Sequence, residues 1–373
     1  MKLNKIFLSL SMLCVSQVQA EYRFNEKEPG FFPSLQFSIN QEDNVYRTQN
    51  NTESDSYYRL APLLDWTMLF GKHGINVVYK GDYGRFNDLS DQDYDDHSLL
   101  SDLELDLSEK LDLTFLGKYQ QGHDRSGDPG SSLLIQTVPD EWTEKALHGK
   151  LTYGRRIANA QLGLALNAKE KRYTNNGRES RDRDNIQATL NFNVRLAPKT
   201  WLVSELRHQT TEFIRPQFIS EDSSETNVFV GAEWEATAKT SGKVLLGYTE
   251  KSPDSSFFKD YSGFGMEANA SWKPKEFSTV SISASRTPKE GGDDVLSFYI
   301  ADKLSIRWQH ELTKLLAFQL DALSENDKYQ SYNREEKYTR FGAKVSYQWK
   351  RTVETGVRAD HLERDSTIIN NDY

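Results

Sequence analysis

Five basic residues near the end of the chain share a pattern that could guide an anion. They stand at alternate positions of short alternating segments, which places their side chains on one common side. They are Lys303, Arg307, Arg340, Lys344 and Arg358, and we call them the basic stripe. Rings of lysine and arginine line pores that pass anions. Acidic residues share the same segments, so pairing of the stripe with acids is an equally open alternative; the acids are Asp321, Glu354 and Asp360.

Catalytic and metal-binding patterns are weak. The nearest acid–histidine group is Asp95-Asp96-His97, and residues 91–96 have the acidic spacing of a calcium loop with Asp102 at the twelfth position. A calcium loop needs glycine at the sixth position, where Asp96 stands. We therefore interpret the run as solvated loop surface, with a rim hydrolase and a calcium site as the remaining alternatives. The sequence predicts no enzyme, no metal site and no cofactor.

The first residues predict an export signal. Lys2 and Lys5 precede the apolar run 6–15, and Val18-Gln19-Ala20 places small residues where a signal peptidase cuts. The run is too short to cross a bilayer as a helix. We predict a signal peptide over 1–20, cleaved after Ala20. The single cysteine lies within it, so the mature chain has no disulfide and no cysteine metal site.

Composition limits the class of partner. Without the leader the chain keeps 44 basic and 55 acidic residues, a net charge of −11, which argues against nucleic acid. The chain is 37% hydrophobic with a mean hydropathy of −0.71. No later stretch is apolar for the ~20 residues of a membrane helix. A barrel crosses a membrane without such a stretch, because every second residue faces water.

A period of two marks most of the chain. Residues 185–196 are apolar at every even position and polar at every odd one, which is typical of a strand with one apolar and one wet face. Seventeen such strands are predicted, near 33–40, 57–69, 74–84, 98–108, 112–121, 144–154, 158–169, 184–196, 200–209, 226–238, 242–250, 262–272, 277–286, 294–309, 314–323, 336–349 and 352–362. Short turns and long polar loops alternate between them. This is the signature of an all-β transmembrane antiparallel up-and-down β-barrel.

Tryptophan supports the same architecture. Six tryptophans lie within about five residues of a short turn, where an interfacial aromatic girdle is expected; they are Trp66, Trp201, Trp234, Trp272, Trp308 and Trp349. Six core tryptophans of a soluble β-protein are the alternative. Because bacterial barrels have an even strand number, we expect about 18 strands with the closing strand absent from this chain; the alternative is that 352–362 closes the barrel. The predicted domains are the leader 1–20, a periplasmic segment 21–32 and the barrel 33–373.

The predicted lumen is polar and wide. Barrels of 16–18 strands leave an aqueous channel. The inward positions carry amides, hydroxyls and mixed charges, as in Gln187, Thr189, Asn191, Ser283 and Ser305. Such groups suit hydrated solutes and sugars especially, although any porin wall shares this character.

Two segments resemble a known family. The start Glu21-Tyr22-Arg23-Phe24, followed by Phe31-Phe32-Pro33-Ser34-Leu35, and the late run 357–366 with Asn370-Asn371-Asp372-Tyr373 resemble β-barrel porins encoded in exopolysaccharide and capsule gene clusters. The resemblance implies a passive conduit for secreted polysaccharide in the outer membrane of a Gram-negative bacterium. It also implies a periplasmic polysaccharide-export protein as partner, with outer-membrane lipid and lipopolysaccharide around the barrel. A general or oligosaccharide-specific uptake porin is the alternative.

Overall fold

Seventeen long strands carry almost the whole structure, a computed structural model that describes residues 7–9, 28–125, 127–128, 137–154, 158–216, 219–237, 239–292, 298–330, 333–368 and 372–373. The strands are β2 (Gly30–Glu42), β3 (Asp55–Phe70), β4 (His73–Phe86), β5 (Tyr94–Ser108), β6 (Leu111–Asp124), β7 (Asp140–Tyr153), β8 (Ala160–Tyr173), β9 (Arg183–Ala197), β10 (Thr200–Phe213), β11 (Ser223–Thr237), β12 (Thr240–Pro253), β13 (Tyr261–Lys275), β14 (Ser278–Glu290), β15 (Phe298–Glu311), β16 (Leu316–Tyr329), β17 (Glu335–Lys350) and β18 (Val353–Ser366). All seventeen predicted strands are confirmed. Strand β2 begins at Gly30, three residues before the predicted start of the barrel.

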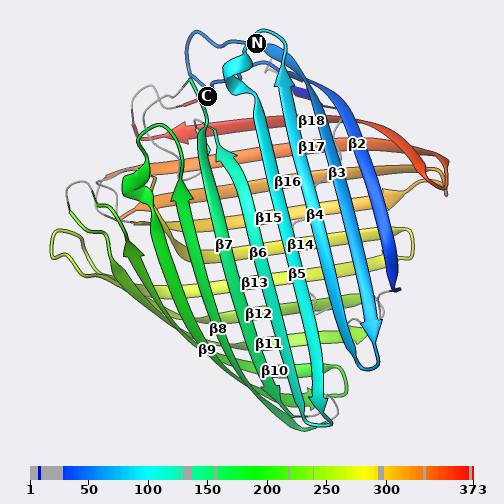
Figure 1. Cartoon of the computed structure of the whole chain (residues 1–373), viewed down its shortest axis with the longest axis vertical. Helices are drawn as coiled ribbons and strands as arrows, with labels where there is room; N and C mark the ends of the chain where they lie inside the picture. Colours follow the sequence, from blue (N-terminus) through cyan, green and yellow to red (C-terminus); the bar gives the residue numbers. More distant parts are fainter. Residues whose placement is uncertain are drawn as a thin grey trace.

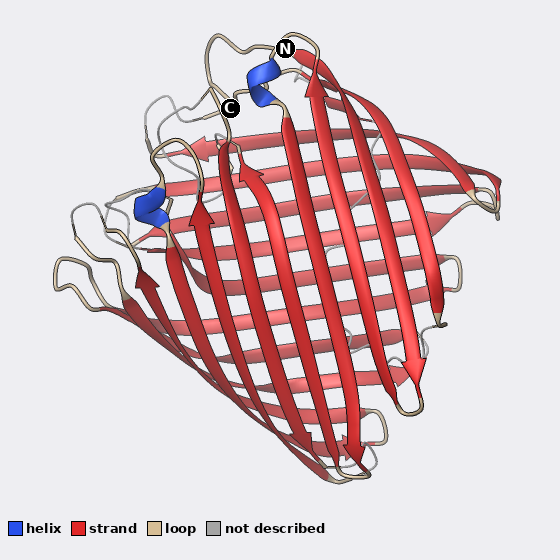
Figure 2. Ribbon diagram, viewed as in Figure 1, coloured by secondary structure: helices blue, strands red, loops and turns tan. Residues whose placement is uncertain are grey.

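Each strand from β2 to β18 pairs antiparallel with its neighbours in sequence, so the sheet winds into a barrel. In Figure 1, β2 to β9 form the near wall and β10 to β18 the far wall, and the two sets cross steeply, as tilted barrel strands do. Figure 2 shows that strands dominate; the two short helical turns are η2 (Ser90–Gln92) and η3 (Glu179–Arg181). No helix among the described residues is long and apolar enough to span a bilayer.

The seam between the first and last long strands is joined by a third segment. In the described part of the chain, β18 and β2 do not pair directly; the three-residue strand β1 (Phe7–Ser9) pairs with both. Leu8 lies opposite Ala359 of β18 and Gln41 of β2. This strand falls within the predicted leader, whose other residues lie outside the described ranges. Cleavage after Ala20 therefore stays a prediction.

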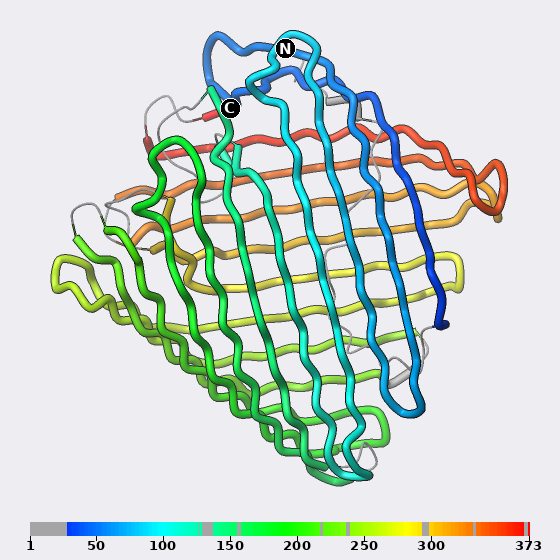
Figure 3. The backbone as a smooth tube through the Cα atoms, in the orientation of Figure 1, coloured from blue at the N-terminus to red at the C-terminus, as the bar shows by residue number. Residues whose placement is uncertain are grey.

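Side-chain alternation separates a lipid face from a water face. On β9, Ile186 and Phe192 are 60% and 50% exposed, whereas Asn185 on the opposite face is 6% exposed. Apolar side chains are left uncovered on the outer wall because lipid surrounds them there. The described strands thus turn their apolar faces outward and not into a central core. Each strand can be followed singly in Figure 3.

The aromatic girdle forms at the short-turn end with one exception. Trp66, Trp272 and Trp349 are among the exposed outward residues at that end. Trp201 instead faces the lumen, where it packs against Val203, Phe229 and Leu245. The register shifts between Thr200 and Trp201, and this bulge lies at the start of β10.

The stability of the barrel is expected to respond differently to a charge introduced on each of the two faces of β8. Leu166 is 58% exposed on the lipid face, and Asn167, the next residue, faces the lumen. We expect Leu166→Arg to destabilise the barrel by about 2–4 kcal/mol, because arginine is costly at the membrane midplane. Urea unfolding in lipid vesicles measures this loss. Asn167→Arg is the matched control, and an equal loss in both variants would contradict the assigned faces.

Candidate functional site: the lumen wall and the long-loop mouth

The basic stripe faces the lumen, and every member is paired with an acid. Lys303 and Arg307 lie on β15, Arg340 and Lys344 on β17, and Arg358 on β18. The ion pairs are Lys303 Nζ–Glu325 at 2.7 Å, Arg307 Nε–Asp321 at 2.6 Å, Arg340 Nη2–Asp360 at 2.9 Å, Lys344 Nζ–Glu354 at 3.0 Å and Arg358 Nη1–Asp321 at 2.9 Å. Of the two alternatives left by the sequence, pairing with acids is therefore the one observed.

The register of the strands explains which acid each base meets. Lys303 lies directly opposite Glu325, and Arg307 directly opposite Asp321, on neighbouring strands. Arg358 lies opposite a like charge, Lys344, so its guanidinium turns to Asp321 and to Asp360. Opposite charges across a strand pair stabilise a sheet, and like charges oppose it. The stripe is therefore a ladder of neutralised pairs.

The same pairing continues around the barrel. Arg207 donates to Glu267 at 2.6 Å, and Glu205 accepts from both Arg207 and Lys243. Lys118 pairs with Glu144 at 3.0 Å on the β6–β7 wall. These parts of the wall thus offer many donors and acceptors whose charges are paired. A solute rich in hydroxyl groups can exchange hydrogen bonds along such a wall.

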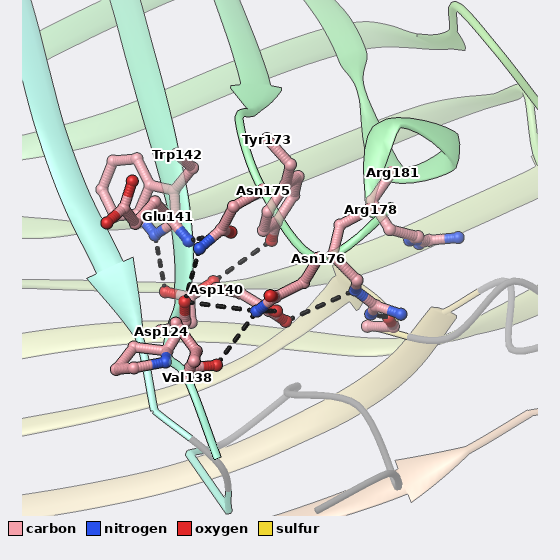
Figure 4. A network of polar contacts seen from close by, with 12 residues as sticks. Asp124, Val138, Asp140, Glu141, Trp142, Tyr173, Asn175, Asn176, Arg178 and Arg181 are labelled. Carbon is pink, nitrogen blue, oxygen red and sulfur yellow. Dashed lines mark hydrogen bonds and ion pairs between the residues drawn. The ribbon is translucent and has the colours of Figure 1, made fainter. Parts of the chain in front are cut away.

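The long-loop end contains a second group of polar residues, which the sequence analysis did not single out. Arg178 pairs through Nε with Asp140 at 3.3 Å, and Asn176 donates to the same carboxylate at 2.8 Å (Figure 4). Arg181 pairs with Glu221 at 2.9 Å and is almost fully buried. We call Arg178 and Arg181 the mouth arginines.

The mouth arginines hold a distant hairpin. Arg178 donates to the carbonyl oxygen of Gly292, and Arg181 to that of Gly291, both in the connection between β14 and β15. Glu290, at the end of β14, accepts from Lys251 of β12 at 2.8 Å. Since Lys251 faces the lumen, these contacts lay the β14–β15 hairpin along the inner wall of the strands between. The hairpin therefore narrows the lumen at this end.

The base of this hairpin is buried on both faces. Phe298, Tyr299, Ile300 and Ala301 are each at most 3% exposed. Tyr299 and Ala301 pack with Tyr329 of β16. An apolar and aromatic base of this kind fixes the hairpin against the wall.

A network of aromatic and charged groups supports the β6–β9 side of the mouth (Figure 4). Asp124 accepts from the Trp142 indole at 2.8 Å and from the Tyr173 hydroxyl at 3.1 Å. Lys171 lies 4.2 Å from the centre of the Trp142 ring and pairs with Asp124 at 3.3 Å. Trp142 lies within β7, two residues before the start predicted for that strand at 144.

The chain end closes the other side of the mouth. The Tyr373 hydroxyl donates to Gly127, and Tyr373 exchanges two backbone hydrogen bonds with Arg364 of β18. Burial would raise the pKa of the nearby Asp128 carboxyl, but the Arg47 guanidinium outweighs burial and lowers that pKa. Burial and a hydrogen bond to Asp91 raise the pKa of Tyr46 to about 12. Loops from three connections are thus linked by hydrogen bonds and an ion pair.

The candidate acid–histidine group does not assemble. Asp95 pairs with Arg85 at 2.6 Å, Asp96 contacts His123 at 2.9 Å, and His97 contacts the Tyr79 hydroxyl at 2.9 Å. Asp102 faces the lumen from β5, which separates it from the proposed calcium loop. Among the described residues no group of three acids or histidines could hold a metal ion.

Comparison with known proteins agrees with the architecture. The family model described as "Putative beta-barrel porin 2" matches residues 30–373. No curated protein matches the chain. Among solved structures, the chain is similar to the FrpB iron transporter from Neisseria meningitidis (13% identity, TM-score 0.46), covering 95% of this chain and 66% of that one. It is also similar to the siderophore receptor PiuA from Acinetobacter baumannii (12% identity, TM-score 0.44), covering 91% and 64%. A BenF-like porin from Pseudomonas fluorescens Pf-5 is 11% identical with a TM-score of 0.47, covering 91% and 94%. The chain thus spans less than two thirds of the first two proteins.

Removing one shared acid predicts a change in ion selectivity. Asp321 accepts from both Arg307 and Arg358, so Asp321→Asn leaves two guanidinium groups without their common partner. We expect the reversal potential in a salt gradient to shift towards that of the anion, at a stability cost on the order of 1–3 kcal/mol. Glu363→Gln, on the outer face of β18, is the control. An unchanged reversal potential in Asp321→Asn would show that the pair does not set the lumen field.

Releasing the hairpin predicts a wider channel. The double variant Arg178→Ala/Arg181→Ala removes the side chains that hold Gly291 and Gly292. We expect a larger single-channel conductance, because the hairpin can then leave the inner wall. Arg172→Ala is the control, since Arg172 pairs with Asp184 on the outer face. A conductance equal to that of the unaltered protein would mean that the hairpin is held by its buried base alone.

Proposed function

The chain belongs to the β-barrel porin family whose model matches it, and we propose a function on this premise. We propose that this outer-membrane channel is a passive conduit for a secreted polysaccharide. Conduction through a pore requires binding that is strong enough for a solute to enter and weak enough for it to leave. A long polymer makes this demand at every step of its passage.

The paired lumen wall is the observation that carries the proposal. Arg307, Asp321 and Arg358 show the pattern: donors and acceptors are present, but each charge is met by its opposite. Sugar hydroxyls both donate and accept hydrogen bonds, so a chain of sugars can pass from one pair to the next. A wall with unpaired charge would bind a charged polymer too tightly to release it.

The alternative is an uptake porin for an oligosaccharide. The inward β14–β15 hairpin favours this candidate, because it narrows the lumen at the end where nutrients would enter. A narrow entrance would select nutrients by size during uptake. A single extended polymer can also pass a narrow lumen, so the hairpin is compatible with the conduit as well. We further propose that the short-turn end meets a periplasmic polysaccharide-export protein, and that lipid and lipopolysaccharide surround the outer wall.

Deletion of the gene tests the conduit. We expect secreted and cell-bound polysaccharide to fall several-fold while polymer accumulates in the periplasm, because synthesis continues behind a blocked exit. Colorimetric uronate and hexose assays on medium, cells and periplasmic extract measure this. Complementation uses Leu166→Arg, which is expected to destabilise the barrel, and Asn167→Arg, which places a charge in the lumen. Comparing the two separates loss of the barrel from loss of passage. Unchanged polysaccharide together with poor growth on an oligosaccharide would replace the conduit with the uptake porin.

A further inference from the structure

The two ends of the barrel carry opposite charge. The short connections are residues 71–72, 109–110, 154–159, 198–199, 238–239, 276–277, 312–315 and 351–352. Together with one flanking residue on each side, which we call the short-turn rim, they contain ten basic and three acidic residues, a net charge of +7. The eight long connections between strands, with the same flanks, contain eight basic and twenty acidic residues, a net charge of −12. This separation is large for a chain whose own net charge is −9.

The described bases of the rim are exposed to water. They lie in the short turns or at the strand ends beside them; they are Lys72, Lys110, Lys199, Lys239, Lys275, Lys314, Lys350 and Arg351. Only some tens of ångströms of paired wall separate them from the acidic mouth. The excess positive charge of the barrel is therefore concentrated at the end that porin convention places in the periplasm.

Trp201 and Arg195 face the lumen directly inside this rim, and we call this pair the Trp201–Arg195 step. Trp201 lies two residues after Lys199. Its side chain faces the lumen, whereas those of Trp66 and Trp272 face lipid. The Arg195 guanidinium lies 4.7 Å from the centre of the Trp201 ring, and among the described residues its Nε has no hydrogen-bond partner. An aromatic ring suits the face of a sugar, and a guanidinium suits a carboxylate. Lysines that served only to hold lipid headgroups would not require an inward tryptophan and arginine.

We propose that the short-turn rim, with the Trp201–Arg195 step inside it, is the entrance for an anionic polysaccharide such as a polyuronate. The inference rests on the proposed conduit and adds its substrate class. Rim charge attracts the polymer from the periplasm and raises its rate of capture. The paired wall then lets it pass, and the acidic loops repel it after exit. The gradient of charge therefore favours capture of the polymer from the short-turn side.

Side-specific capture in planar bilayers tests the entrance. Oligogalacturonate added to the short-turn side is expected to block the current more often than the same oligomer added to the long-loop side, whereas maltooligosaccharide of equal length shows no preference. The triple variant Lys110→Gln/Lys199→Gln/Lys314→Gln is expected to lower the capture rate from the short-turn side roughly tenfold at low salt. The difference should shrink as salt shortens the Debye length from about 30 Å at 0.01 M to about 8 Å at 0.15 M.

Matched variants separate the parts of the entrance. Arg215→Gln/Lys259→Gln/Lys337→Gln removes three exposed bases near the long-loop end and should leave capture from the short-turn side unchanged. Trp201→Leu should shorten each block without lowering the capture rate, because the step acts after the rim. Equal capture from both sides, or unchanged capture in the rim variant, would overturn the proposal. A rim variant that alters only thermal stability in phosphatidylglycerol vesicles would likewise overturn it and assign the lysines to lipid. Side-specific capture with normal secretion in the deletion strain would overturn the conduit alone.

Discussion

The pairing of every backbone N–H and C=O group within the hydrocarbon layer is the constraint on which the rest of this structure depends. Lipid offers no hydrogen bonds, so a membrane-spanning sheet must supply all of them itself. Sixteen consecutive antiparallel ladders do this between β2 and β18. At the seam β18 and β2 do not pair directly in the described part of the chain; Tyr373 pairs with Arg364 on the edge of β18, and β1, which lies within the predicted leader, pairs with both strands. The seam is therefore the part of the wall that depends most on segments far apart in sequence.

The alternation imposed by those ladders also explains the lumen. Once the apolar face of each strand is turned to lipid, most polar side chains of the membrane-spanning part must share the interior, including many charges. A charge in a partly dry wall is costly unless an opposite charge and hydrogen bonds compensate it. Register decides whether that compensation is available. It sets Arg307 opposite Asp321, but it sets Lys344 opposite Arg358, so both of these find acids that are not directly opposite them. The neutral wall is a consequence of the register as much as of the composition.

These relations show why the sequence predicts the strands better than the site. Period two is a local property, so all seventeen strands could be placed without knowing any neighbour. Pairing of the basic stripe depends on the register between strands, which the pattern of one strand does not contain. Trp201 was assigned to the girdle from its distance to a turn; its parity with Val203 and Arg207 would have indicated the lumen. The mouth arginines meet carbonyl groups more than 100 residues away, through contacts that no local spacing records.

The distribution of charge along the barrel axis limits where selectivity can arise. Within the wall, paired charges give a weak field, so a solute there is distinguished mainly by hydrogen bonding and by size. The two ends present opposite net charge to a solute, because the short-turn rim is basic and the long loops are acidic. The hairpin held by Arg178 and Arg181 narrows the lumen at the mouth. A barrel of this kind discriminates between solutes at its two ends. The wall between the ends needs only to bind the passing solute weakly.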